Sequence, residues 1–227
     1  MQIKVTMEPQ KYDNMIKAVG SVVFGDEITV CDFTLRERKN GGLFLSVPNR
    51  ETGKEDMNGR RKYKDIAFPI TKECKTVLEE AAIESYEKES TVFLTDKKPA
   101  RLLIEASVFE TPYENRVGKA QIVISDIFVI TNIFIHKHTD GSLYVTYPNF
   151  KTQYVGRDGK PIYREFIMMS TSLRKQINGV ILQEYKKNLK LKEHDRFSIK
   201  SRLDEAVRVI KLKPDKKRTL KKDEHIL

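Results

Sequence analysis

The chain has 227 residues, which leaves room for two domains of ordinary size. With 39% hydrophobic and 33% charged residues, the composition predicts modest cores beneath a highly charged surface. No stretch approaches the ~18 consecutive apolar residues of a membrane span, and the first residues lack the apolar core of a signal peptide. We therefore expect a cytoplasmic protein.

The net charge of +10 is concentrated near the C-terminus. Residues 186–222 hold fifteen Lys and Arg against five Asp and Glu, whereas residues 1–185 are nearly balanced. A block of this kind favours polyanions, with nucleic acid first and an acidic membrane surface or acidic protein second.

Four strands are predicted in the first part of the chain. Alternating or β-branched runs indicate strands at residues 3–7, 18–24 and 28–38, and another at 43–47 follows the turn signal at 40–42. This arrangement of short strands and turns is typical of a small antiparallel sheet.

The third of these strands has an apolar face formed by Cys31, Phe33 and Leu35, which we expect to lie on the core. Cys31 and Cys74 are the only cysteines of the chain. A disulfide or zinc site would need more ligands, so both are interpreted as buried free thiols.

A polar loop is predicted from Asn49 to Lys62, because this stretch is rich in charges and contains two glycines. A short strand follows at 63–68. Thr71 is a suitable N-cap for a helix that runs to about Lys88 and covers one face of the sheet.

The same order of predicted strands, loop and helix then repeats at an offset of 100 residues. Leu43-Phe44-Leu45-Ser46-Val47-Pro48-Asn49 corresponds to Leu143-Tyr144-Val145-Thr146-Tyr147-Pro148-Asn149. A long period seen only twice indicates a tandem duplication rather than a solenoid. We expect the turn at Ser125-Asp126 to be tighter, by two residues, than the one at 25–27.

The second copy is predicted to end in a helix from about Thr171 to Lys187, in which Gly179 marks close packing against another element. Beyond Asn188 the repeat is over. Apolar residues at helical spacing from Phe197 to Ile210 predict a separate basic amphipathic helix that Pro214 stops. The predicted domains are therefore 1–88 and 100–188, followed by a basic tail at 189–227.

Each copy resembles the stage V sporulation protein G family, also called septation protein G, whose members are small bacterial regulators that bind nucleic acid. The first copy carries the resemblance through several features in a fixed order: Lys17-Ala18, Val30-Cys31-Asp32-Phe33, the hairpin from Asn40 to Pro48, the basic loop, the segment from Tyr63 to Ile70, and the helix ending at Tyr86. The second copy departs from this pattern at Ser142, Tyr147 and Met169.

Members of this family usually carry one such domain and pair as homodimers. The resemblance therefore implies an α+β protein with two tandem copies of a small antiparallel sheet plus C-terminal helix. The fused pair would form an internal pseudo-dimer in which each copy supplies an edge that the other lacks. The basic C-terminal extension has no equivalent in the family pattern, and further self-association remains open.

Motifs for catalysis are missing from the sequence. No glycine-rich phosphate loop precedes a helix, no His and Cys cluster has metal spacing, and no Ser, His and Asp set stands out. His136 and His138 share one strand face and could hold a metal, but a solvated polar face is favoured. We expect a protein that is not an enzyme and has no cofactor or metal.

Cations in the two equivalent loops, together with three in the tail, are the predicted nucleic-acid ligands, because phosphates spaced along a duplex suit paired cations. They are Arg50, Lys54, Arg60, Arg61, Lys62 and Lys64 in the first copy, Lys151, Arg157, Lys160 and Arg164 in the second, and Lys216, Lys217 and Arg218 in the tail. The alternative for the loops is a solvated surface, since Glu51, Glu55 and Asp56 offset part of the charge.

Phe44 and Tyr144 point away from the predicted core. They could stack on unpaired bases or pack under the helix or at the interface between the copies. For the tail, a solvating extension or docking helix is the alternative to contact with nucleic acid.

The favoured hypothesis is a regulator that binds DNA or RNA, rather than a membrane. The alternative is a protein-interaction adaptor, linked to cell division or sporulation, that uses a sheet edge and the tail helix.

Overall fold

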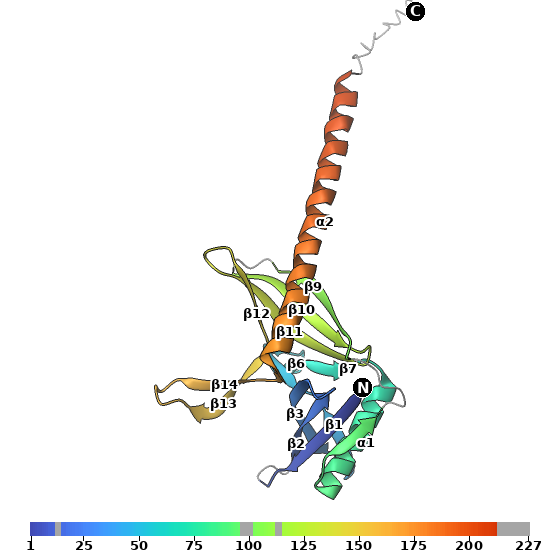
Figure 1. Ribbon diagram of the computed structural model, residues 1–227, viewed down its shortest axis with the longest axis vertical. Coiled ribbons are helices and arrows are strands. Elements are labelled where there is room, and N and C mark those ends of the chain that lie inside the picture. Colours follow the sequence, from blue (N-terminus) through green and yellow to red (C-terminus); the bar gives the residue numbers. More distant parts are fainter. Residues whose placement is uncertain (12–14, 96–101, 112–114, 213–227) are drawn as a thin grey trace, which may run out of the picture. The chain divides into compact units, whose positions relative to one another are not determined.

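The computed structural model describes residues 1–11, 15–95, 102–111 and 115–212 (Figure 1). The chain divides into two compact units, Met1–Tyr185 and Lys186–Leu227. The first unit contains every strand of the described residues, so the predicted halves 1–88 and 100–188 fold together within one unit, apart from the last residues of the second. That each half is a domain in its own right stays a prediction.

The protein is α+β, with antiparallel sheets and two helices in the described residues. No helix in this part of the chain is long and apolar enough to cross a membrane. The first half contains, in order, β1 (Gln2–Pro9), β2 (Ile16–Phe24), β3 (Ile28–Glu37), β4 (Leu43–Ser46), β5 (Asn49–Glu55), β6 (Arg61–Asp65), β7 (Ala67–Pro69), α1 (Lys72–Lys88) and β8 (Val92–Thr95).

The second half repeats this order up to the helix. Its elements are β9 (Ile104–Glu110), β10 (Arg116–Ile124), β11 (Phe128–Lys137), β12 (Leu143–Thr146), β13 (Asn149–Val155), β14 (Pro161–Glu165), β15 (Ile167–Met169) and α2 (Thr171–Leu212). From β10 to β15, each strand begins 100 residues after its counterpart in the first half.

The predicted tighter turn in the second half is wrong. Three residues separate β2 from β3, and three separate β10 from β11. Asp26 and Asp126 both have positive φ, at 60° and 58°. Ser125, at φ 46°, takes the left-handed conformation that Gly25 adopts in the first turn, so no residue has been lost.

Each half contributes a short strand to the sheet of the other half. β7 pairs with β11, with Ala67 opposite Ile130, and β15 pairs with β3, with Ile167 opposite Val30. The resulting sheets have the orders β15-β3-β2-β1-β8, with β4 also on β3, and β12-β11-β10-β9, with β7 also on β11. The exchange is extended by two further backbone hydrogen bonds, from Cys31 N to Phe166 O at 2.8 Å and from Thr131 N to Ile66 O at 2.7 Å.

The exchanged strands enclose a core drawn from both halves. Phe24 and Phe128 are fully buried, and their ring centroids lie 4.8 Å apart. Ile66 and Phe166, which directly precede the exchanged strands, are 0% and 2% exposed. The hydrophobic free energy of the two halves is thus gained largely in one shared core.

A bulge in β3 corrects the predicted core face of this strand. Ile28 and Val30 are buried, and burial then resumes one residue out of phase at Phe33 and Leu35. Asp32 lies between them with φ 70°, and the β2–β3 register shifts at the same place. Cys31 is therefore half-buried rather than a core residue, and burial raises the pKa of both the Cys31 thiol and the Asp32 carboxyl. Cys74 is likewise a half-buried free thiol.

Helix α1 begins as its sequence predicts. The Thr71 hydroxyl accepts a hydrogen bond from Cys74 N at 3.1 Å, which satisfies one of the free amides of the first turn. Leu78, Ala81 and Ala82 are buried on the face toward β1. The predicted cap and extent of this helix are confirmed.

Helix α2 differs from the prediction at its C-terminal end. It continues without a break from Thr171 to Leu212, so the two predicted helices around Asn188 are one. Ile177, Ile181 and Tyr185 are buried in the first unit. Gly179 was expected to mark close packing, but a Cβ at this residue would meet no atom within 4 Å, so that prediction is wrong.

Candidate nucleic-acid interface

The two predicted basic loops are β-hairpins. β5 pairs with β6, with Arg50 opposite Lys64, and β13 pairs with β14, with Phe150 opposite Arg164. Each pair is a separate two-stranded sheet. The expectation of irregular loops is wrong because a ribbon exposed on both faces has no apolar side and hence no burial pattern to reveal its strands.

The hairpin turns share a backbone hydrogen bond, from Asp56 N to Arg60 O and from Gly156 N to Lys160 O, both at 2.8 Å, but their aspartates lie at different positions. In the first, the Asp56 carboxylate accepts hydrogen bonds from Asn58 N at 2.8 Å and Arg60 N at 2.9 Å. In the second, Asp158 accepts one from Lys160 N at 3.2 Å. Gly59 and Gly159 supply the positive φ that each turn needs, at 72° and 75°. These bonds fix the turns that join the strands on which most of the cations lie.

All ten predicted hairpin cations are exposed. Among the described residues, only two of them form ion pairs: Arg61 with Glu51 at 3.3 Å, and Lys160 with Asp158 at 3.5 Å. The remaining eight are not neutralised by a neighbouring carboxylate in this part of the chain. They are Arg50, Lys54, Arg60, Lys62, Lys64, Lys151, Arg157 and Arg164. Such cations are available to phosphate groups.

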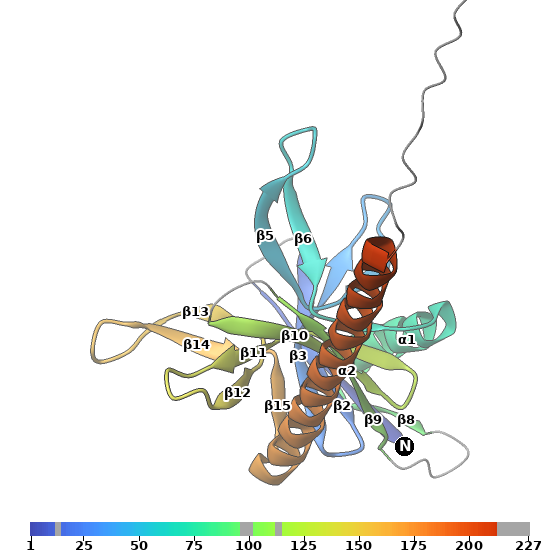
Figure 2. The same cartoon turned by 90° about the horizontal axis from the view of Figure 1, so that it is seen from above.

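The hairpins β5–β6 and β13–β14 extend from the first unit in different directions (Figure 2). They therefore do not form one continuous basic strip. A polyanion that touches both must run from one hairpin across the body to the other. The predicted tail cations Lys216, Lys217 and Arg218 lie outside the described residues.

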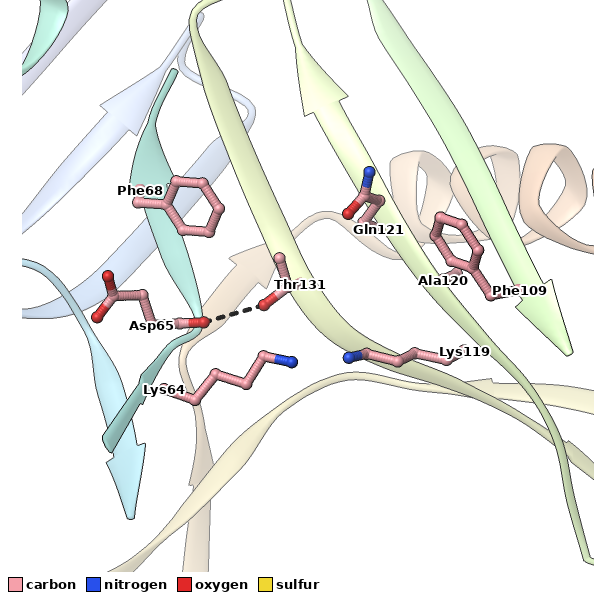
Figure 3. A pocket seen from close by; sticks show the side chains of 8 residues that line it. All are labelled: Lys64, Asp65, Phe68, Phe109, Lys119, Ala120, Gln121 and Thr131. Atoms are coloured by element: carbon pink, nitrogen blue, oxygen red, sulfur yellow. Dashed lines mark hydrogen bonds between the residues drawn. The ribbon is translucent and has the colours of Figure 1, made fainter. Parts of the chain in front are cut away.

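Lys64, at the base of the first hairpin, has a partner that the sequence did not single out. Its ammonium group faces that of Lys119, from β10, across a cavity (Figure 3). The contact with Lys64, together with burial, lowers the pKa of Lys119 to about 8. The signal in the sequence is the lysine at 119 where the offset places Val19 in the other half.

A second group of residues lies on β11 and β12, outside the core. Tyr144 stacks on His136 with a centroid distance of 5.0 Å and on His138 with 4.2 Å. Tyr144 is 39% exposed, so the ring can also offer an edge to solvent. His136 Nε2 is hydrogen-bonded to the Thr146 hydroxyl at 3.0 Å, and burial, aided by Arg116, lowers the pKa of the imidazole.

Phe44, the counterpart of Tyr144, is half-buried beneath the guanidinium of Arg38, whose Cζ lies 4.9 Å from the ring centroid. The first half therefore covers its aromatic ring with a cation, whereas the second half stacks histidines on it. Within the described residues, no group of three or more His, Cys, Asp or Glu side chains could hold a metal ion.

A protein-family model described as SpoVG matches residues 1–88. A protein named putative septation protein SpoVG from Finegoldia magna is 39% identical over 84 residues, which are 35% of this chain and 71% of that protein. The chain belongs to the SpoVG family.

Further SpoVG relatives agree with this match. Putative septation proteins SpoVG from Alkaliphilus oremlandii and Caldanaerobacter subterraneus are each 38% identical, over 78 and 76 residues, which are 34% of this chain and 76% of each relative. No solved structure matches the chain. The SpoVG match contains hairpin β5–β6, Lys64 and Phe44, and the predicted membership of the family is confirmed. Hairpin β13–β14 and Tyr144 lie outside it.

Proposed function

We propose that this SpoVG protein is a cytoplasmic bacterial regulator that binds DNA or RNA and has no catalytic activity. Its two basic hairpins would contact phosphates of one nucleic acid, and the C-terminal basic segment would add further contacts. A role connected with septation or sporulation is suggested by the names of its relatives.

The observation that carries this proposal is the set of eight exposed hairpin cations that have no carboxylate partner among the described residues. An exposed cation with a neighbouring carboxylate gains little from a phosphate, because the existing ion pair must be broken. An unpaired one releases counterions from the nucleic acid when it binds, which favours association. Phosphate contacts of this kind carry no sequence information.

The proposal includes an internal pseudo-dimer. Support comes from the constant offset of 100 residues between equivalent strands and from the reciprocal pairing of β7 with β11 and β15 with β3. Exchange of the same element in both directions is what two-fold related subunits do. The pseudo-dimer would present two related hairpins from one chain.

A salt titration tests the proposal. Fluorescence anisotropy with labelled single-stranded and duplex DNA and RNA, between about 50 and 200 mM salt, should give affinities that fall steeply with salt. For duplex DNA the slope of log affinity against log salt is expected to be about −0.9 for each phosphate neutralised. Affinity that does not change with salt, or no binding to any of the four probes, would refute the proposal.

A variant that removes charge from the tail separates its contribution to nucleic-acid binding from that of the hairpins. Replacing Lys216, Lys217 and Arg218 with Gln should reduce the salt slope while the hairpins still bind, because these side chains would contact phosphates and not bases. Replacing three exposed lysines elsewhere, Lys39, Lys72 and Lys75, with Gln provides the matched control. Equal effects of the two triple variants would show that only net charge matters.

A protein-interaction adaptor is the second candidate, favoured by an open sheet edge. β8 lies at the end of the six-stranded sheet and pairs only with β1 within the described residues. An open edge can accept a strand from another chain. Affinity capture from nuclease-treated bacterial lysate separates the two functions, since an adaptor keeps its partner after nuclease and a nucleic-acid bridge does not.

A further inference from the structure

We propose that the cavity between β6 and β10 is a binding site for the phosphate group of a small phosphorylated ligand, with a nucleoside monophosphate as the class that fits its walls. This site shares Lys64 with the hairpin cations proposed to contact nucleic acid, whereas Lys119 belongs to the cavity alone. It would recognise a single compact ligand rather than a polymer backbone.

The cavity has a volume of about 430 Å³, within the range of small-molecule sites. Its charged end is formed by Lys64 and Lys119, whose side chains extend toward each other from two different strands (Figure 3). The carboxylate of Asp65 is turned away from this pair in the same view. Neither lysine has a carboxylate within ion-pair distance among the described residues.

Two ammonium groups held face to face repel each other, and the fold must offset that repulsion. The same repulsion, together with burial, lowers the pKa of Lys119 to about 8. At pH 7 Lys119 still carries its proton for most of the time. A dianion placed between them converts the repulsion into two favourable interactions, so the pair is better suited to the bound state than to the empty one.

The position of Lys64 is fixed by the strand exchange. Thr131, on β11, is 7% exposed, and its hydroxyl is within hydrogen-bonding distance of the Asp65 carbonyl at 3.1 Å and the Ile66 carbonyl at 3.2 Å. The Thr131 amide also donates to Ile66 O. The backbone next to Lys64 is thus attached to the sheet that carries Lys119, which preorganises the two cations.

The remaining walls favour a flat organic group attached to the phosphate. Phe68 is half-buried and Phe109 is 57% exposed, so a ring can pack against either without a large rearrangement. Gln121 offers an amide that can both donate and accept hydrogen bonds. Aromatic walls with one amide and a cation pair are the chemistry that a nucleobase and its phosphate require.

The equivalent place in the other half lacks this chemistry. The offset of 100 residues replaces Lys119 with Val19, Lys64 with Arg164 and Thr131 with Cys31. One cation remains where two stand in the cavity. We therefore expect one ligand for each chain and use Val19 to choose the test substitution.

The test is isothermal titration calorimetry of the full chain with three probes: inorganic phosphate, adenosine monophosphate and adenosine. Phosphate and the nucleotide should bind, the nucleotide more tightly, and adenosine should bind at least tenfold more weakly than the nucleotide. Lys119→Val and Lys64→Met should each weaken nucleotide binding at least tenfold. Lys119→Arg, which keeps the charge, should retain it, and Lys72→Met, at an exposed lysine outside both sites, is the matched control.

Protonation gives an independent readout. The groups with charge that face Lys119 are Lys64 and the phosphate itself, which is mainly dianionic above pH 7; Gln121, Thr131, Phe68 and Phe109 do not titrate in this range. Nucleotide affinity of the wild type should therefore fall as pH rises through about 8 and above it. That fall should be absent from Lys119→Val.

Equal affinities for adenosine and the nucleotide, or unchanged nucleotide affinity in Lys119→Val, would contradict the proposed site. The absence of binding heat with both inorganic phosphate and the nucleotide would contradict it as well. A labelled oligonucleotide measured with Lys119→Val separates this inference from the hairpin proposal. The oligonucleotide should keep its salt slope in that variant, because all the hairpin cations, Lys64 included, are intact. Loss of oligonucleotide binding together with nucleotide binding would mean that the cavity is part of the polymer site and would contradict a separate small-ligand site.

Discussion

The two halves of the first unit follow the same order of strands and then diverge at their helices. α1 ends at Lys88, and the chain returns as β8 along β1, which completes a six-stranded sheet. α2 does not end at the equivalent turn but continues to Leu212, and the second sheet has five strands. The same order of strands thus leads to a sheet that ends at β8 in one half and to a sheet that ends at β9 in the other.

The difference originates in a few residues at the helix end. Glu89 adopts a left-handed conformation at φ 50°, and its amide bonds back to Ser85 and Tyr86 carbonyls. The Ser85 hydroxyl accepts from Met7 N at 2.9 Å and donates to Ser90 O at 2.7 Å, which holds the turn against β1. In the second half, the corresponding stretch 184–190 contains Lys, Leu and Glu, which continue a helix readily.

The greatest losses of stability are expected at the exchange that unites the halves. Phe166→Ala should lower the free energy of unfolding by about 3–5 kcal/mol, and Ile66→Ala by about 2–5 kcal/mol, because both side chains are almost fully buried beside an exchanged strand. Urea denaturation followed by circular dichroism measures both losses.

These two variants also test whether the halves are one cooperative unit. Each should shift a single transition, because residues of both halves share one core. Two separate transitions, of which only one moves, would show that the halves unfold independently and that the exchange contributes little. Met57→Ala, at an exposed position of the first hairpin, is the control and should leave the midpoint within about 0.5 kcal/mol of wild type.

Variants that remove charge from one hairpin at a time compare the contributions of the two hairpins to nucleic-acid binding. Replacing Arg50, Lys54 and Lys62 with Gln should reduce the salt slope for duplex binding by up to about 2.7, at about 0.9 for each phosphate that is no longer neutralised. The same change at Lys151, Arg157 and Arg164 should have a similar effect if the hairpins are equivalent. Anisotropy titrations at several salt concentrations measure both.

The two triple variants together show whether the halves bind alike. If only the first triple variant reduces the slope, nucleic acid contacts only the hairpin inside the SpoVG match, and the proposed pairing of the hairpins is wrong. Stability measurements accompany these titrations. Both hairpins are largely exposed, so neither variant should change the unfolding midpoint by more than about 0.5 kcal/mol.

Sequence reasoning recovers the elements that carry a burial pattern. Val5 and Ile28 have polar neighbours on both sides, and the strands containing them appear where expected. Thr71 predicts the start of α1 because its side chain satisfies an amide of the first turn. The repeat itself is visible because the second half preserves the turn at residues 140–142 and the strand that follows.

Features that depend on contacts between distant segments have no signal in the local sequence. β7 and β15 have three residues each, too few to show which sheet they join. The pairing of β7 with β11 and of β15 with β3 is therefore seen only in the fold. The bulge at Asp32 moves Cys31 off the core face, although simple alternation places it there. Lys119 reads as an ordinary surface lysine until the fold brings it opposite Lys64.

A smaller effect is expected in the helix that the two halves do not share. Gly179→Ala should raise the free energy of unfolding by up to about 1 kcal/mol, since Ala favours a helix over Gly and the new methyl group meets nothing within 4 Å. The corresponding residue in α1 is Glu80, which already favours a helix. A fall in the urea midpoint would mean that Gly179 does contact another element, as the sequence first indicates.

The weakest effect concerns His136, which stands where the first half has Arg36. Burial, aided by Arg116, lowers the pKa of His136 below its ordinary value of 6.5, so the unfolded chain binds the proton more readily than the folded one. The stability that neutral His136 contributes is therefore present above pH 6.5 and is lost as the pH falls below that value.

His136→Gln should remove this dependence. The urea midpoint of the wild type should fall more between pH 7.5 and pH 5 than that of the variant, and a measurement at pH 8 gives the cost of the substitution that does not depend on protonation. Identical pH profiles would mean that Tyr144 and Thr146 hold the imidazole equally well in both protonation states. The stacked face of the second half would then contribute nothing to the change of stability with pH.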